Sequence, residues 1–249
     1  MDNHYDLSKE ASSTDSLYHN HSDPHHRTFA LADVILGGQD GLVNVLGVIL
    51  GVAAATSDPR IVIVAGLAAT FAESVSMGAV AYTSTLAEAD FYESEREREY
   101  RHITDVPHLE KAEVREIYSR KGFQGELLDR IVDTITANED VWVAVMMAEE
   151  HRLTPTNRSE AFRAALVVGF SAIVGSLIPL APFAFLPVGT SMLVSVLITA
   201  IVLFGVGAYK ARMTVGRPGR SGLEMAIIGT LSALVGYAVG ALLKVPTTP

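Results

Sequence analysis

The fold is decided by one stretch, residues 79–106, which reads AVAYTSTLAEADFYESEREREYRHITDV. It begins as the end of an apolar run and passes, without Pro or Gly, into a charged segment of good helix formers. A helix needs only about 20 residues to cross the hydrocarbon core of a bilayer. This stretch therefore predicts one helix that leaves the membrane and continues for several turns as a stalk.

The stalk opens a charged island, residues 89–161, between two apolar halves. The island holds 17 of the 28 Asp and Glu residues and 10 of the 19 Lys and Arg residues. Pro107 suits the first turn of a second helix, and Gly122 suits its end. A third amphipathic helix is predicted over 125–137, and Asn138 is a plausible N-cap for a fourth. The island is thus predicted to be a small helical domain.

The apolar halves contain runs too long and continuous for a soluble core. Five of them could cross about 30 Å of hydrocarbon: Val34–Ala55, Ile61–Leu86, Ala164–Leu180, Thr190–Tyr209 and Leu223–Leu243. The predicted fold is therefore all-α, a five-transmembrane-helix membrane protein with the helical domain inserted between helices 2 and 3. Glycines four residues apart indicate close helix packing: Gly37/Gly41, Gly47/Gly51 and Gly236/Gly240.

The distribution of Lys and Arg predicts the orientation. The island and the link between spans four and five are rich in them, whereas the links at the other end contain only Arg60. Positively charged loops stay in the cytosol. We therefore expect a cytosolic N-terminal tail over 1–32, transmembrane helices 1 and 2 over 33–88, a cytosolic island over 89–161, and helices 3–5 with a short C-terminus over 162–249.

Composition excludes several classes of function. The chain has no cysteine, which excludes disulfides and thiolate metal sites. Its formal charge of −9 argues against nucleic acid as a partner. The polar tail is predicted to be disordered. Its histidines could gather metal loosely, but a disordered tail is the favoured interpretation: His19, His21, His25 and His26.

Two of the apolar runs nevertheless carry a carboxylate, Asp40 in the first and Glu73 in the second. Ionisable groups inside a span are costly and usually functional. Met77 follows Glu73 by four residues, so the two side chains share a helix face, and their oxygen and sulfur donors suit ions such as Fe(II). We interpret the three as a translocation path. The alternatives are a helix-end role for Asp40 and simple packing for Met77.

Three of the predicted helices of the island, namely the stalk, the second and the last, each offer a pair of potential metal ligands. The alternative is a solvated charged face, balanced by the interleaved arginines. The Met-Met doublet beside two glutamates favours the metal site, because it stands where the last helix should turn toward its neighbours. The candidate ligands are Glu99, His102, Glu110, Glu113, Met146, Met147 and Glu150.

These motifs together resemble the vacuolar iron transporter family, from about Arg27 to Leu243. The likeness rests on five motifs in order: Asp40-Gly-Leu with Ser76-Met-Gly78, the stalk Tyr92–Ile103, Pro107 to Glu113, Trp142 to Glu150, and Ile173 to Pro182. The resemblance implies a homodimer of five-helix subunits that exports Fe(II) from the cytosol, coupled to inward proton movement, with some tolerance of Mn(II).

The family's residues carry over by position. Those of the path correspond to Asp40 and Met77, and the cytosolic ligands correspond to Glu99, Glu110, Glu113, Met146, Met147 and Glu150. Two departures stand out. Ala69 occupies the usual place of the second-span carboxylate, and we interpret Glu73 as that carboxylate moved by one turn. His102 replaces a usual Glu, and its imidazole also binds Fe(II) well and responds to pH.

The leading hypothesis is a proton-coupled divalent transition-metal transporter, not an enzyme, with the metal as substrate and no permanently bound cofactor. Its expected partners are metal ions, protons, membrane lipid and a second copy. Two alternatives stay open. A membrane-anchored di-iron oxidase would use Glu99-x-x-His102, although the chain has no second Glu-x-x-His. The other is a metal sensor without flux. The membrane is expected to be the plasma membrane in a prokaryote and the vacuolar membrane in a eukaryote.

Overall fold

The computed structural model describes residues 29–56, 58–214 and 216–243, and this part of the chain is helical without a strand. The elements are α2 (Phe29–Thr56), α3 (Pro59–Asp105), α4 (Pro107–Arg120), α5 (Gly125–Thr136), α6 (Glu139–Glu149), α7 (Glu160–Leu180), the 3₁₀ turn η3 (Ala181–Ala184), α8 (Val188–Met213) and α9 (Pro218–Leu242). The all-α prediction is confirmed. The predicted tail and its histidines lie outside the described residues, except for 29–32, which begin α2.

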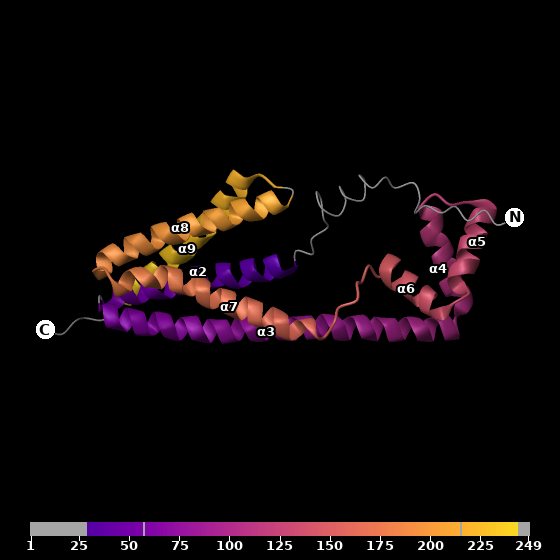
Figure 1. Cartoon of the computed structure of the whole chain (residues 1–249), viewed down its shortest axis with the longest axis horizontal. Coiled ribbons are helices and arrows are strands. Elements are labelled where there is room, and N and C mark those ends of the chain that lie inside the picture. The colour runs from indigo at the N-terminus through magenta and orange to yellow at the C-terminus, as the bar shows by residue number, and fades with distance from the viewer. Residues whose placement is uncertain (1–28, 57, 215, 244–249) are drawn as a thin grey trace, which may run out of the picture.

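The longest of the described helices is α3, which has 47 residues and runs along most of the length of the molecule (Figure 1). It starts where the side chain of Asp58 accepts a hydrogen bond of 2.8 Å from the backbone N–H of Arg60. It stops because Val106 precedes a proline and adopts a non-helical φ of −136°. The predicted stalk is therefore continuous with the second span.

Within the described ranges, five helices are long and apolar enough to cross a membrane: α2, α3, α7 with η3, α8 and α9. Their outward faces carry large apolar side chains, such as Val75, Phe170 and Leu193, which are 73%, 69% and 70% exposed. A soluble protein rarely leaves so much apolar surface in water. These faces are suited to lipid, and the five predicted spans are confirmed.

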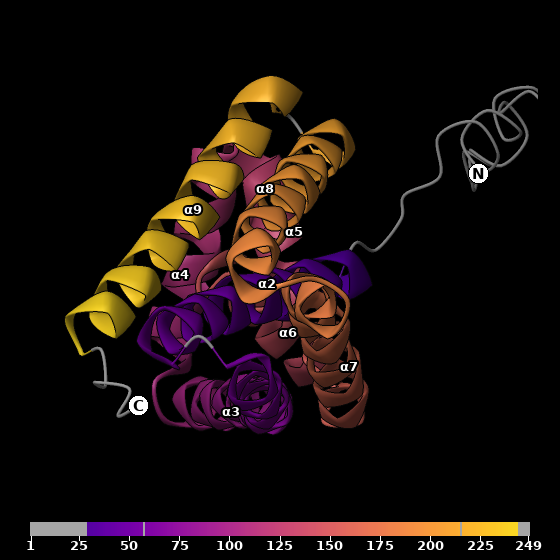
Figure 2. The ribbon, with the colours of Figure 1, turned by 90° about the vertical axis from the view of Figure 1, so that its left-hand side faces the viewer.

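Helix α2 lies at the centre of the bundle, between the α3–α7 pair and the α8–α9 pair (Figure 2). Glycines permit its close approach to both neighbours. A Cβ atom on Gly41 would lie 2.3 Å from the carbonyl oxygen of Ala172, and one on Gly236 would lie 2.1 Å from that of Gly47. Because neither space can hold a methyl group, the glycine pattern reflects close helix packing, as predicted.

Helices α4, α5 and α6 fold against the far end of α3 around an apolar core of their own, and we call this unit the head (Figure 1). Its helix boundaries follow the predicted local signals. Pro107 begins α4, and Gly122 follows its end at a φ of +99°, a conformation that favours glycine. Asn138 caps α6 by accepting a hydrogen bond of 3.1 Å from the N–H of Val141.

Candidate functional site

A first polar cluster lies between α2 and α3, inside the spans. Asn44 donates a hydrogen bond of 2.8 Å from Nδ2 to Oε1 of Glu73, and the carboxyl group of Asp40, one turn earlier on α2, lies near the same side chain. The two helices form an antiparallel hairpin, so residues equally distant from its turn face each other. At 1.5 Å per residue, Glu73 lies roughly 20 Å along α3 from the turn between α2 and α3. The part of α2 at the same distance from this turn is the stretch between Asp40 and Asn44.

The structure thus brings together the two predicted carboxylates of the path. Met77 lies one turn beyond Glu73 and is half-buried, whereas Ala69 packs beside an apolar cluster of the bundle. Asn44 was not among the predicted site residues. It stands one turn after Asp40 in the same span, and pairing the two spans as a hairpin would have found it.

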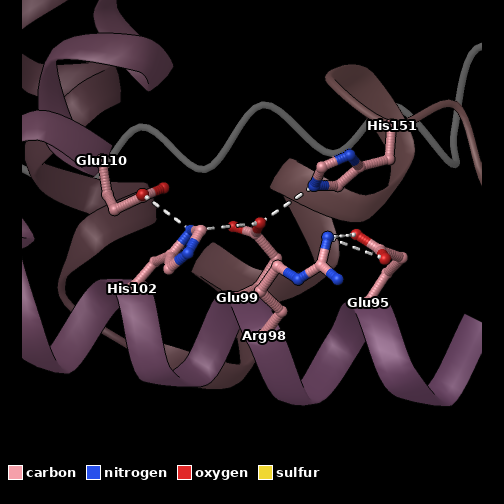
Figure 3. A network of polar contacts seen from close by, with 6 residues as sticks. All are labelled: Glu95, Arg98, Glu99, His102, Glu110 and His151. Carbon is pink, nitrogen blue, oxygen red and sulfur yellow. Dashed lines mark hydrogen bonds and ion pairs between the residues drawn. The ribbon is translucent and has the colours of Figure 1, made fainter.

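A second cluster lies in the head, where α3, α4 and the end of α6 meet (Figure 3). Glu99 and Glu110 are almost fully buried, at 2% and 5% exposure. Nε2 of His151 lies 2.9 Å from Oε1 of Glu99. Nδ1 of His102 lies 3.4 Å from Oε1 of Glu110 and 3.9 Å from Oε1 of Glu99. Two imidazoles therefore flank one buried carboxylate.

Within the described residues, the basic partners of Glu99 and Glu110 are the imidazoles of His102 and His151, whereas other acids of the head pair with Lys or Arg. The ion pairs that Lys and Arg form in the described part of the chain join other carboxylates, including Arg98–Glu95, Arg115–Asp129, Arg120–Glu116 and Lys121–Glu149. Oε2 of Glu99 and Oε2 of Glu110 are buried, and neither has a hydrogen-bond partner in this part of the chain. Buried acids are costly without a cation. The arrangement therefore suits a bound divalent ion.

The proximity of these groups alters their affinity for protons. Burial, followed by the charges of Glu99 and Glu113, raises the pKa of Glu110 to about 7. Burial and the charge of Glu113 also raise the pKa of Glu150. Burial opposes the charged form of His151, but the hydrogen bond with Glu99 and the charge of Glu150 outweigh it and raise its pKa. These raised pKa values favour the protonated side chains, and a metal ion that binds the cluster would have to displace those protons.

The predicted ligands are placed in three ways. Glu99, His102 and Glu110 converge, and Glu150 converges with Glu99. Glu113 is exposed on α4, near enough to act on the pKa of both Glu110 and Glu150. Met146 and Met147 are 0% and 1% exposed and belong to the apolar core of the head. Their role as ligands stays a prediction.

His151 also lies at the cluster, and the sequence did not indicate it. It follows directly after Glu150 and stands four residues after Met147, a spacing that places it on one helix face with that predicted ligand, but it was not among the predicted ligands. Its partner Glu99 is 52 residues away along the chain. The unused signal was its place beside the last glutamate of the Met- and Glu-rich helix, where a chain that turns toward its neighbours could carry both side chains inward.

Comparison with known proteins agrees with this architecture. The sequence model of the VIT family matches residues 31–241. The chain is 34% identical to Vacuolar iron transporter 1 of Oryza sativa subsp. japonica, covering 89% of each chain. It is 31% identical to Vacuolar iron transporter 1 of Tulipa gesneriana, covering 94% of this chain and 95% of the relative. It is also 31% identical to the Vacuolar iron transporter of Plasmodium falciparum (isolate 3D7), covering 96% and 91%.

The apolar helices indicate a multi-pass integral membrane protein, and the family match together with the relatives' names supports metal transport as its class of function. The resemblance inferred from the separate motifs is confirmed, since the match extends across both apolar halves and the head. The chain therefore belongs to the VIT family.

Proposed function

We propose that the chain is a proton-coupled transporter that exports Fe(II), with tolerance of Mn(II), from the cytosol across a membrane. The observation that carries this proposal is the cluster of Asp40, Asn44 and Glu73 inside the spans. A charge at that depth costs about 3 kcal/mol on insertion scales, and two neighbouring carboxylates cannot both stay charged cheaply. Neutralisation by a metal ion in one step and by protons in another would couple the two fluxes.

The same cluster supports a homodimer as the working unit. In the single chain Asn44 is exposed, and Asp40 and Glu73 are half-buried. Contact between these groups and lipid would be costly. A second copy covering this face of α2 and α3 would shield them and would place two carboxylate pairs along one path.

The orientation of the spans is supported by the position of the basic residues. Those of the α8–α9 link lie at the end of the bundle that faces the head (Figure 1): Lys210, Arg212, Arg217 and Arg220. The link with Arg60 lies at the opposite end, at the start of α3. By the positive-inside rule, the head and the N-terminus are cytosolic. The head would then capture the ion before it enters the path.

Metal uptake by the full chain in sealed liposomes tests the proposal. Fe(II) under reducing conditions is added outside liposomes that contain a pH dye in the lumen. The fraction of heads that face outward is determined from their accessibility to protease. We expect Fe(II) to enter faster when the lumen is acidic, and the lumen to lose protons as it enters. A rate of Fe(II) uptake that does not depend on the pH gradient, together with an unchanged lumenal pH, would contradict the coupling. Co(II), Mn(II) and Mg²⁺ compared one by one give the substrate range.

A membrane-anchored di-iron oxidase is the second candidate, because the structure adds His151 to the single Glu-x-x-His of the sequence. Di-iron carboxylate proteins use four Glu and two His on facing helices. The head gathers a similar set: Glu99, Glu110, Glu113, Glu150, His102 and His151. An oxygen electrode separates the two candidates. Repeated oxygen consumption on each addition of Fe(II) to the full chain would favour the oxidase, and uptake without oxygen consumption would favour the transporter.

A further inference from the structure

Glu99 belongs to two groups of potential ligands, and Figure 3 shows His102 and Glu110 on one side of it and His151 on the other. The first group joins it to His102 and Glu110, and the second joins it to His151 and Glu150. In each group the three ligand atoms lie within 4.8 Å of one another. Each group therefore offers one imidazole and one carboxylate besides Glu99.

The spacing of the donor atoms matches neighbouring positions around a metal ion. With metal–ligand bonds of about 2.1 Å, adjacent ligand atoms lie about 3.0 Å apart in an octahedron and about 3.4 Å apart in a tetrahedron. Nε2 of His151 lies 2.9 Å from Oε1 of Glu99, and Nδ1 of His102 lies 3.4 Å from Oε1 of Glu110. An ion could be held by either pair with little movement of the side chains.

The carboxylates also have the capacity for further bonds. Oε2 of Glu99 and Oε2 of Glu110 are buried, and within the described segments neither accepts a hydrogen bond. A buried carboxylate oxygen without a partner is costly. A carboxylate with a free oxygen can bind one ion through each oxygen, so Glu99 is suited to bridge two ions.

The backbone at the end of α6 supports the position of His151. The N–H groups of Glu150 and His151 both donate to the carbonyl oxygen of Met146, at 3.0 and 3.3 Å. Arg152 then adopts a φ of +55°, a left-handed conformation that is unfavourable for a residue with a side chain. The N–H of Leu153 then donates to the carbonyl oxygen of Met147 at 2.9 Å, so this conformation closes the end of the helix in the manner of a left-handed C-cap. This turn carries Glu150 and His151 toward Glu99.

We propose that His151 is a metal ligand and that Glu99 is shared by two ions, each also bound by one imidazole and one further carboxylate. The inference rests on the proposed function, because the ions are those that the chain transports. Imidazole nitrogen favours Fe(II), Co(II) and Zn(II) over Mn(II), and carboxylate oxygen alone suits Mg²⁺ and Ca²⁺. His151 would thus make the head select against Mn(II), Mg²⁺ and Ca²⁺.

The test uses the full chain in detergent, purified without a histidine tag, with the five histidines before residue 29 replaced by Gln. Co(II) and Mn(II) binding are measured by equilibrium dialysis. His151→Gln is compared with His108→Gln, which changes an exposed histidine on α4 outside the cluster. Loss of a group that only hydrogen-bonds to a metal ligand typically weakens metal binding 10–100-fold, and loss of a ligand itself should weaken it at least as much. We therefore expect His151→Gln to weaken the binding of one of the two Co(II) ions by at least about tenfold, with a smaller effect on the binding of Mn(II). The His108→Gln variant should bind both metals as the parent does.

A second measurement covers the case in which His151→Gln does not fold. X-ray absorption of the parent loaded with two Zn(II) should show one imidazole per zinc. Unchanged Co(II) binding in folded His151→Gln, or imidazole scattering from a single histidine for two zinc ions, would overturn the inference. Fe(II) uptake by the same proteins separates this failure from that of the proposed function: normal uptake with no role for His151 refutes the inference alone, whereas two-ion binding without uptake refutes transport alone.

Discussion

Glu110 shows how burial changes the chemistry of a single residue. Its pKa rises to about 7 because the side chain is buried and because Glu99 and Glu113 are close by. The folded head therefore retains a proton that the unfolded chain loses near pH 4.5. The resulting stabilisation is complete below that pH and is lost as the pH rises through about 7. Metal binding has the opposite dependence, since the ion must displace this proton.

The proton on Glu110 should make metal binding by the head depend on pH. Between pH 5 and 7, the affinity of the head for Co(II) should rise by about tenfold per pH unit for each proton displaced. Glu110→Gln should weaken binding and reduce that slope by about one proton, whereas Glu116→Gln, which removes an exposed acid of the same helix, should leave both unchanged. Titration calorimetry of the full chain in two buffers counts the protons released. An equal slope in Glu110→Gln and its parent would show that Glu110 keeps no proton near neutral pH.

Asn44 holds the carboxylate of Glu73 inside the spans, because its amide donates a hydrogen bond of 2.8 Å to that side chain. Asn44→Ala should leave Co(II) binding by the head intact and lower the rate of Fe(II) uptake by about tenfold or more, as loss of a ligand's partner commonly does. Val48→Ala, one turn further along α2 and also exposed, is the matched control. If both variants transport as the parent does, Asn44 only packs against Glu73.

At the scale of the helices, the glycines that bring α2 against α9 set the strictest limit on the spans. A Cβ atom on Gly236 would lie 2.1 Å from a backbone oxygen of α2, whereas one on Gly205 would meet nothing within 4 Å. Gly236→Ala should therefore lower the thermal unfolding temperature in detergent by several degrees, a loss of about 1–3 kcal/mol for an overpacked contact. Gly205→Ala should leave it unchanged or raise it. A tolerated Gly236→Ala would mean that the two helices can separate without cost.

The helices themselves could be predicted because their ends are encoded locally. Pro107, Gly122 and Asn138 begin or end helices by fixing the backbone angles or by capping, and they do so in the structure as predicted. The five spans follow from length and apolar composition. The pairings that complete both clusters are not local: Asn44 meets Glu73 across 29 residues, and His151 meets Glu99 across 52. Spacing along one helix cannot reveal a contact between two helices.

At the scale of the whole molecule, α3 joins the two clusters as one continuous helix. Glu73 and Glu99 both belong to it, and they are separated by about 40 Å at 1.5 Å per residue. A change in the packing of the head could therefore reach the spans without passing through a flexible loop. The sequence predicted this link, because residues 79–106 contain neither of the residues that break helices.

The central claim is that the carboxyl pair inside the spans carries metal ions and protons in turn. Simultaneous recording of Fe(II) uptake and lumenal pH in liposomes, for the parent, Asp40→Asn and Glu73→Gln, tests it most directly. Both variants keep the size of the side chain but cannot titrate. We predict that each inserts normally, retains Co(II) binding in the head, and loses both fluxes together. Parental metal and proton fluxes in Glu73→Gln would contradict the claim and leave Asp40 as the one carboxylate of this pair in the mechanism.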